Sequence, residues 1–272
     1  MRMPAIWISV PVFFVLISCS SLPSLPPDQD FQGIVALSNC SGSLVRFTTS
    51  KPDDKGLILT NGHCLEGALL KPGESLADRP SDRSFSLVGA GGTARRATLQ
   101  ASALIYATTS MTDMALYRLT ESYAEIERSY GAQARTIAEQ RAKAGASVKI
   151  ISGYWHSKLP CTIDGFVHEL KEQGLVWRDA IRYDAACDVI DGTSGAPIVD
   201  VISGEVVGIS NTGNDGGVLC SLNNPCENDE ASHVAAIRGR NYGQQTHWLY
   251  ACLTSENRLK LDLPGCMLPA PR

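Results

Sequence analysis

The chain has 272 residues, of which 44% are hydrophobic, and it carries a formal net charge of −4 at pH 7. This composition is typical of a folded protein of one or two domains, and it excludes a disordered or collagen-like chain. The slight excess of acidic residues and the absence of a basic run give no support to nucleic-acid binding.

The first 19 residues have the form of an export signal. Arg2 supplies a positive charge, and the stretch 6–17 is almost entirely apolar. This run is shorter than the roughly 20 residues that cross a bilayer, so residues 1–19 are predicted to be a signal peptide. The stretch ends in Leu-Ile-Ser-Cys, which resembles the lipobox of bacterial lipoproteins with Cys19 as the acylated residue. Ordinary signal cleavage nearby is the alternative.

Residues 20–32 are rich in Pro and Ser and have no hydrophobic periodicity. They are predicted to form a semi-extended tether that reaches about 40 Å, at about 3 Å per residue. A tether is useful when its start is anchored, which fits an acylated Cys19. Ser20 after that cysteine suggests an outer-membrane lipoprotein in a Gram-negative host, by analogy with other lipoproteins. Free secretion is the alternative.

Short apolar or alternating runs begin at residue 33, and turn-rich stretches separate them, as is typical of antiparallel sheets. Strands are predicted at 33–37, 43–48, 56–60, 84–88, 93–104 and 114–119. Six short strands suit a small antiparallel barrel, which would span residues 33–120. Residues 122–144 contain much Ala, Glu, Arg and Gln and are expected to be partly helical. We take 121–145 as an inter-domain connection.

A second series of strands follows, predicted at 147–151, 159–169, 175–183, 196–201, 205–210 and 232–237. Residues 244–253 are expected to form a closing helix, and its Trp248 and Leu249 would pack on the second barrel. The second domain would then span residues 146–272. The predicted fold class is all-β, with two antiparallel six-stranded barrels.

Three stretches carry the side chains of a nucleophilic catalytic group. Residues 191–197 place Ser194 beside glycines at the start of a strand, so the N–H groups of Gly192 and Ser194 can point into one oxyanion site. A serine needs a base to take its proton, and the base needs a buried carboxylate to orient it. An apolar strand ends at His63, and Asp113 stands at the head of an alternating strand.

These stretches resemble the chymotrypsin-like serine proteases, and more closely the bacterial secreted members. The resemblance is carried by 40–45 (Cys-Ser-Gly-Ser-Leu-Val), by His63 with the cysteine after it, by Asp113 and by the loop at Ser194. It covers about residues 33–250 and implies an active site in the cleft between two barrels. It also implies a monomeric serine endopeptidase that acts on polypeptides through an acyl-enzyme and needs no metal or cofactor.

The sequence says less about which side chain the enzyme would prefer in its substrate. Asp188, six residues before Ser194, stands where trypsin-like enzymes carry the aspartate at the base of the primary pocket, which would select Arg or Lys. A similar Cys-Asp pair occurs in bacterial relatives with other preferences, so this stays open. Ser210 stands where Glu-selective relatives carry a histidine, which argues against a preference for Glu. Thr193 replaces the aspartate that binds a new N-terminus in animal enzymes, so activation by N-terminal insertion is not expected.

The chain has nine cysteines, and assigning Cys19 to a lipid leaves eight, an even number that suits disulfides in an exported protein. The resemblance implies two pairs, and proximity alone suggests two more; these are Cys40–Cys64, Cys161–Cys187, Cys220–Cys226 and Cys252–Cys266. A zinc site is not expected, because no CxxC pair is present.

Two other classes of function compete with this interpretation. An α/β-hydrolase esterase needs Gly-x-Ser-x-Gly and the order Ser, Asp, His, and this chain has neither. A catalytically silent or latent protease-like domain that binds partners on the cell envelope remains the second interpretation.

Overall fold

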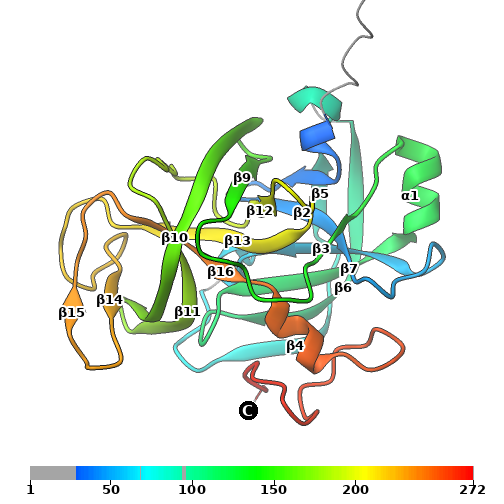
Figure 1. Cartoon of the computed structure of the whole chain (residues 1–272). Coiled ribbons are helices and arrows are strands. Elements are labelled where there is room, and N and C mark those ends of the chain that lie inside the picture. The colour runs from blue at the N-terminus through cyan, green and yellow to red at the C-terminus, as the bar shows by residue number, and fades with distance from the viewer. Residues whose placement is uncertain (1–28, 68, 94–95, 272) are drawn as a thin grey trace, which may run out of the picture.

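A computed structural model describes residues 29–67, 69–93 and 96–271, and its strands form two sheets that lie side by side (Figure 1). The predicted signal peptide, Cys19 and most of the predicted tether lie outside the described residues. Among the residues that are described, no helix is long and apolar enough to cross a membrane.

The first sheet closes on itself into a barrel. Its neighbouring strands are, in order, β1 (Ile34–Ala36), β5 (Ser84–Leu87), β6 (Ala97–Thr108), β7 (Met114–Ser122), β3 (Lys55–Thr60) and β2 (Ser41–Arg46), and β2 pairs again with β1. Every pairing in this ring is antiparallel. Apolar side chains that alternate along the strands, such as Ile58, Tyr117 and Leu119, fill the interior.

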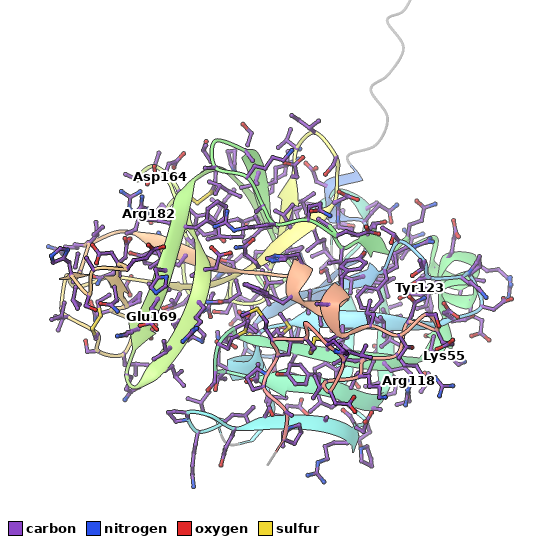
Figure 2. All side chains as sticks on the ribbon, turned by 60° about the horizontal axis from the view of Figure 1, so that its bottom comes forward. Lys55, Arg118, Tyr123, Asp164, Glu169 and Arg182 are labelled. Carbon is purple, nitrogen blue, oxygen red and sulfur yellow. A yellow bond between two sulfur atoms is a disulfide. The ribbon has the colours of Figure 1, made fainter. Side chains whose placement is uncertain are left out.

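The second sheet closes in the same way. Its ring contains β11 (Leu175–Tyr183), β16 (Asn241–Gln245), β13 (Val206–Gly213), β12 (Pro197–Asp200), β9 (Ser147–Ser152) and β10 (Ser157–Glu172), and β10 pairs again with β11. Outside the ring, β14 (Cys226–Asn228) pairs with β10 and with β15 (Val234–Ala235). Arg182 forms ion pairs with Asp164 and Glu227 and thereby ties β11 to β10 and β14 (Figure 2). The two closed rings confirm the predicted fold class.

The end of the chain differs from the prediction. The expected helix at 244–253 begins with two strand residues, and the helical part is a 3₁₀ helix, η4 (His247–Cys252). The polar stretch 241–245 is a fully buried strand because its backbone pairs with β11 and β13 on its two sides. Leu249 does not pack on the second barrel alone: it belongs to a core that joins the barrels and contains Met114, Leu116, Ile151, Val206 and Ile209.

Two other strands differ from their predicted positions. The strand expected at 93–104 lies at 97–108, because residues 90–92 form a 3₁₀ turn, η3 (Ala90–Gly92). Of the strand expected at 232–237, only two exposed residues pair. β4 (Ser75–Pro80) was not predicted: it is short, ends in proline and pairs only with β6, outside the ring.

The connection between the barrels contains one helix, α1 (Tyr123–Tyr130). Ser122 and Glu125 form a capping box at its start, and Gly131 ends it in the left-handed conformation. The buried Tyr123 hydroxyl donates to the Val45 carbonyl at 2.7 Å and holds the helix on the first barrel (Figure 2). β8 (Arg135–Thr136) then runs parallel to β2, and the chain enters the second barrel.

The eight described cysteines form four disulfides, in the pairs expected from the sequence: Cys40–Cys64, Cys161–Cys187, Cys220–Cys226 and Cys252–Cys266. Disulfides persist in oxidising compartments and are rare in the cytosol. Four of them indicate an exported protein.

Candidate active site

The predicted base and its carboxylate lie together on the first barrel. His63 belongs to the short 3₁₀ helix η2 (Gly62–Cys64) that follows β3, and Asp113 immediately precedes β7. One oxygen of the fully buried Asp113 carboxylate lies 2.8 Å from His63 Nδ1, and the other accepts the His63 backbone N–H at 3.0 Å. The glycine at position 62 lets this segment lie against Thr108 and Asp113. A Cβ at this position would lie 2.0 Å from the Thr108 carbonyl oxygen.

The environment of His63 favours the charged imidazolium. Burial opposes the charged form, but the negative charge of Asp113 and its hydrogen bond outweigh burial, and Glu172 adds a weaker attraction. The pKa of His63 is therefore raised above its usual 6.5. A histidine with such a pKa can both accept and return a proton near neutral pH.

This shift predicts how activity depends on pH. The predicted base can accept a proton only when His63 is neutral, and the protonated form dominates below its pKa. We expect kcat/KM for a peptide substrate to fall about tenfold for each pH unit on the acidic side, with a midpoint above pH 6.5. A pH–rate profile of the free enzyme measures this midpoint, and a midpoint at or below 6.5 would contradict the assignment.

Ser194 lies on the second barrel, just before β12, and lines the same cavity as His63 and Asp113. Its Oγ donates to the Asn211 carbonyl oxygen at 3.2 Å, and among the described residues it makes no hydrogen bond to His63. Catalytic hydrogen bonds are often not formed in enzymes without substrate, so this geometry leaves the base–nucleophile pair available.

The loop before Ser194 leaves two amide groups free. In the described part of the chain, the N–H groups of Gly192 and Ser194 donate to no protein acceptor. The carbonyl groups of the same two peptides are held: the Asp191 oxygen accepts from Trp155 Nε1 at 2.5 Å, and the Thr193 oxygen accepts the Ala196 N–H at 2.9 Å. Because the N–H and C=O of a trans peptide point in opposite directions, these bonds fix where the free N–H groups point.

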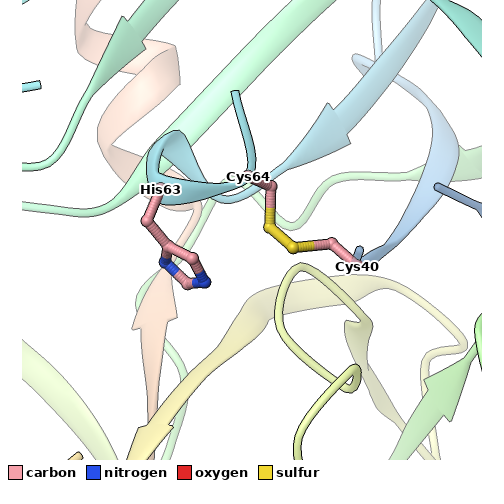
Figure 3. Close-up of side chains that lie close together, drawn as sticks. All are labelled: Cys40, His63 and Cys64. Atoms are coloured by element: carbon pink, nitrogen blue, oxygen red, sulfur yellow. A yellow bond between two sulfur atoms is a disulfide. The ribbon is translucent and has the colours of Figure 1, made fainter. Parts of the chain in front are cut away.

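His63 lies close to two cysteines, and residues of these types can bind metal ions. The sulfur atoms of Cys40 and Cys64 and a nitrogen of His63 lie within 4.8 Å of one another (Figure 3). The two sulfurs are joined in a disulfide, so neither is the thiolate that a metal ion requires. The disulfide instead fastens the histidine segment to the start of β2.

The cavity has a volume of about 570 Å³ and opens between the barrels. The structure does not place the two predicted specificity residues in it: Asp188 is exposed, and the Ser210 side chain is buried. The residues that follow them in sequence line the cavity instead. The lining also contains the buried Glu172, which sequence reasoning missed. Glu172 is simply the last residue of β10, and no motif or spacing distinguishes it.

Apolar side chains surround the mouth of this cavity. Four large apolar residues of the lining are half exposed or more: Leu69, Trp155, Ile190 and Leu222. Exposed apolar side chains around a cleft are a common feature of surfaces that bind other proteins.

Comparisons with known proteins agree with this arrangement. The profile of the trypsin-like peptidase domain matches residues 40–209, more than half of the chain. No curated protein matches the sequence. Among solved structures, the active form of the Rv3671c protease from M. tuberculosis is 16% identical, with a TM-score of 0.50, and the match covers 94% of this chain and 97% of that one.

Two further solved structures are similar to this chain. A Glu endopeptidase is 16% identical, with a TM-score of 0.48 and coverage of 80% and 86%. The thermostable serine protease AL20 from an extremophilic microorganism is 14% identical, with a TM-score of 0.44 and coverage of 79% and 92%. The family profile settles the assignment: this chain belongs to the trypsin-like peptidases and is a serine endopeptidase with the chymotrypsin-like fold.

Proposed function

We propose that this protein cleaves peptide bonds with His63, Asp113 and Ser194 through an acyl-enzyme. The observation that carries this proposal is the His63–Asp113 pair, which opens on the same cavity as Ser194. The free amides of Gly192 and Ser194 support it, because they can receive the oxyanion of an acyl-transfer intermediate.

The reaction uses only groups of the protein and water. Ser194 Oγ attacks the carbonyl carbon of the scissile bond while His63 takes its proton, and the amides of Gly192 and Ser194 bind the oxyanion. His63 then gives the proton to the departing amine, which leaves an ester on Ser194. Water attacks this ester with His63 again as base, and the new carboxylic acid departs as Ser194 regains its proton.

Fluorophosphonate labelling tests this function. We expect one covalent adduct on the soluble protein that starts at residue 20, located by peptide mass analysis at Ser194 and absent from Ser194→Ala. Ser203→Ala is the matched control, because Ser203 lies in an exposed turn and should leave labelling unchanged. If well-folded, disulfide-bonded protein gives no adduct, the proposal fails and a latent or silent binding domain is favoured.

The preference for Arg or Lys that the sequence suggested has no support from Asp188 in this fold. That carboxylate is exposed and outside the lining of the cavity. Any preference for basic side chains therefore has to come from carboxylates that do line it.

We further propose that the protein is an envelope lipoprotein anchored through Cys19. The Leu-Ile-Ser-Cys stretch after a short apolar run, followed by the Pro- and Ser-rich stretch 20–32, supports this localisation. Cys19→Ala should release the protein from the membrane fraction or leave it unprocessed, as seen by fractionation and intact mass. Unchanged membrane retention and processing would contradict the lipid anchor.

A further inference from the structure

We propose that Glu172 and Asn211 form a cation-binding subsite of the active-site cavity, which takes a guanidinium or ammonium group of the polypeptide substrate. This inference rests on the proposed function, because it names the class of substrate for that same site.

Glu172 is a fixed, buried carboxylate at the wall of the cavity. Its side chain lies at the end of β10, and the residue is only 6% exposed. One carboxylate oxygen accepts the Thr212 hydroxyl at 2.7 Å, and the other accepts the Asn223 backbone N–H at 2.9 Å. Each oxygen can accept a further hydrogen bond, so the carboxylate is held in place and still has capacity for a ligand.

Glu172 has no cationic partner that is permanently charged. It forms no ion pair with Lys or Arg in the described part of the chain, and no Lys or Arg lines the cavity. The attraction to His63 is weaker than the effect of burial, which raises the pKa of the Glu172 carboxyl. Since a buried anion without a counter-ion is unfavourable, a cation delivered by the substrate would stabilise the ionised form.

Asn211 supplies an independent observation at the same cavity. It lies on β13, lines the cavity and is 6% exposed, yet neither its side-chain oxygen nor its side-chain nitrogen has a hydrogen-bond partner among the residues that the structure describes. Buried amides without partners are rare in folded proteins because each unpaired group costs free energy. Both atoms are enclosed, so rotation of the Asn211 side chain toward the cavity would give its oxygen a partner in a guanidinium or ammonium group that pairs with Glu172.

The charges around the cavity select the same ligand class. Besides the catalytic Asp113, the lining contains the carboxylates Glu172, Asp191 and Asp215, and His63 is the one lining group that can become positive. An anionic side chain would therefore be repelled, whereas a cationic side chain would be attracted. The subsite lies on β10 and β13, apart from the exposed Asp188 that precedes the serine loop.

Binding to Ser194→Ala protein tests the subsite without any need for turnover. The probes are pairs of short peptides that differ only by arginine or its neutral isostere citrulline, with this residue moved along the peptide. Calorimetry or the fluorescence of Trp155 and Trp177, which line the cavity, gives the dissociation constants. We expect one position at which arginine binds at least about tenfold more tightly than citrulline, and added salt should reduce this ratio.

Glu172→Gln, added to the Ser194→Ala protein, should bring the ratio of citrulline to arginine dissociation constants close to one, while citrulline peptides keep their affinity. Asp188→Asn is the matched control and should keep the full ratio. Asn211→Ala is a second variant, which replaces Glu172→Gln in the test if that protein does not fold. It should lower the ratio severalfold. The proposal is overturned if arginine is not preferred over citrulline at any position. It is also overturned if the preference survives Glu172→Gln or disappears with Asp188→Asn. Failure of the proposed function shows separately, as absence of the fluorophosphonate adduct on native protein.

Discussion

Replacing Asp113 by asparagine is expected to lower kcat by about four orders of magnitude, because a triad whose histidine holds the wrong tautomer cannot accept the serine proton. In the native protein, His63 Nδ1 lies 2.8 Å from an Asp113 carboxylate oxygen, and because a carboxylate oxygen only accepts, the ring hydrogen belongs on Nδ1. An amide NH₂ at that position is a donor and cannot accept this hydrogen. His63 would then keep its proton on Nε2, the nitrogen that has to act as base.

The fold should tolerate this substitution, since Asn has the shape of Asp. The other side-chain oxygen still accepts the His63 backbone N–H, and the Asn61 amide still donates to the Asp113 carbonyl. Steady-state kinetics above the pKa of His63 measure kcat and KM, and KM should change little. Asp188→Asn, which removes an exposed carboxylate, is the control. A loss of less than tenfold from Asp113→Asn would remove Asp113 from the catalytic group.

Gly195→Ala should destabilise the protein by about 2–4 kcal/mol and abolish activity, through a clash between the barrels. Gly195 has a φ of +78°, and a Cβ there would lie 2.2 Å from Thr60 Oγ1 and 2.3 Å from the Ser41 carbonyl oxygen. Both contacts belong to the first barrel, whereas Gly195 follows the nucleophile on the second. A methyl group would therefore push the serine loop away from β2 and β3.

Gly204→Ala separates the clash from backbone strain. Gly204 has a φ of +73°, close to that of Gly195, but its added Cβ would meet no atom within 4 Å. This control should cost only the strain of a left-handed alanine, about 1 kcal/mol. Urea unfolding followed by tryptophan fluorescence and near-UV circular dichroism measures both variants. Equal urea midpoints for Gly195→Ala and Gly204→Ala would show that the close contact between the barrels at Gly195 does not determine stability.

Sequence reasoning picked out three residues, from local patterns, that the structure brings to one cavity. His63, Asp113 and Ser194 each stand at the edge of a readable strand, in an order that matches one class of hydrolase. The barrel strands were found where apolar residues alternate, and missed where a polar strand such as 241–245 is buried by its pairing on two sides.

Which residues line the cavity could not be predicted from local sequence patterns. Glu172 and Asn211 meet there because β10 and β13 run past the same opening, and no spacing along the chain records that meeting. Asp188 was chosen by counting back from Ser194, and counting cannot show that a side chain turns outward to solvent.

The Ser41 backbone N–H donates to the Ser194 carbonyl at 2.8 Å, and the Ser41 hydroxyl holds the Gly192 carbonyl, so the first barrel shapes the nucleophile loop of the second. Half of the chemistry is therefore absent from either barrel alone. While the chain is being made, the proposed base and its carboxylate emerge before Ser194, and the Ser194 loop takes its final shape only when it meets Ser41 of the first barrel. We expect newly made protein to be inactive until the two barrels have docked.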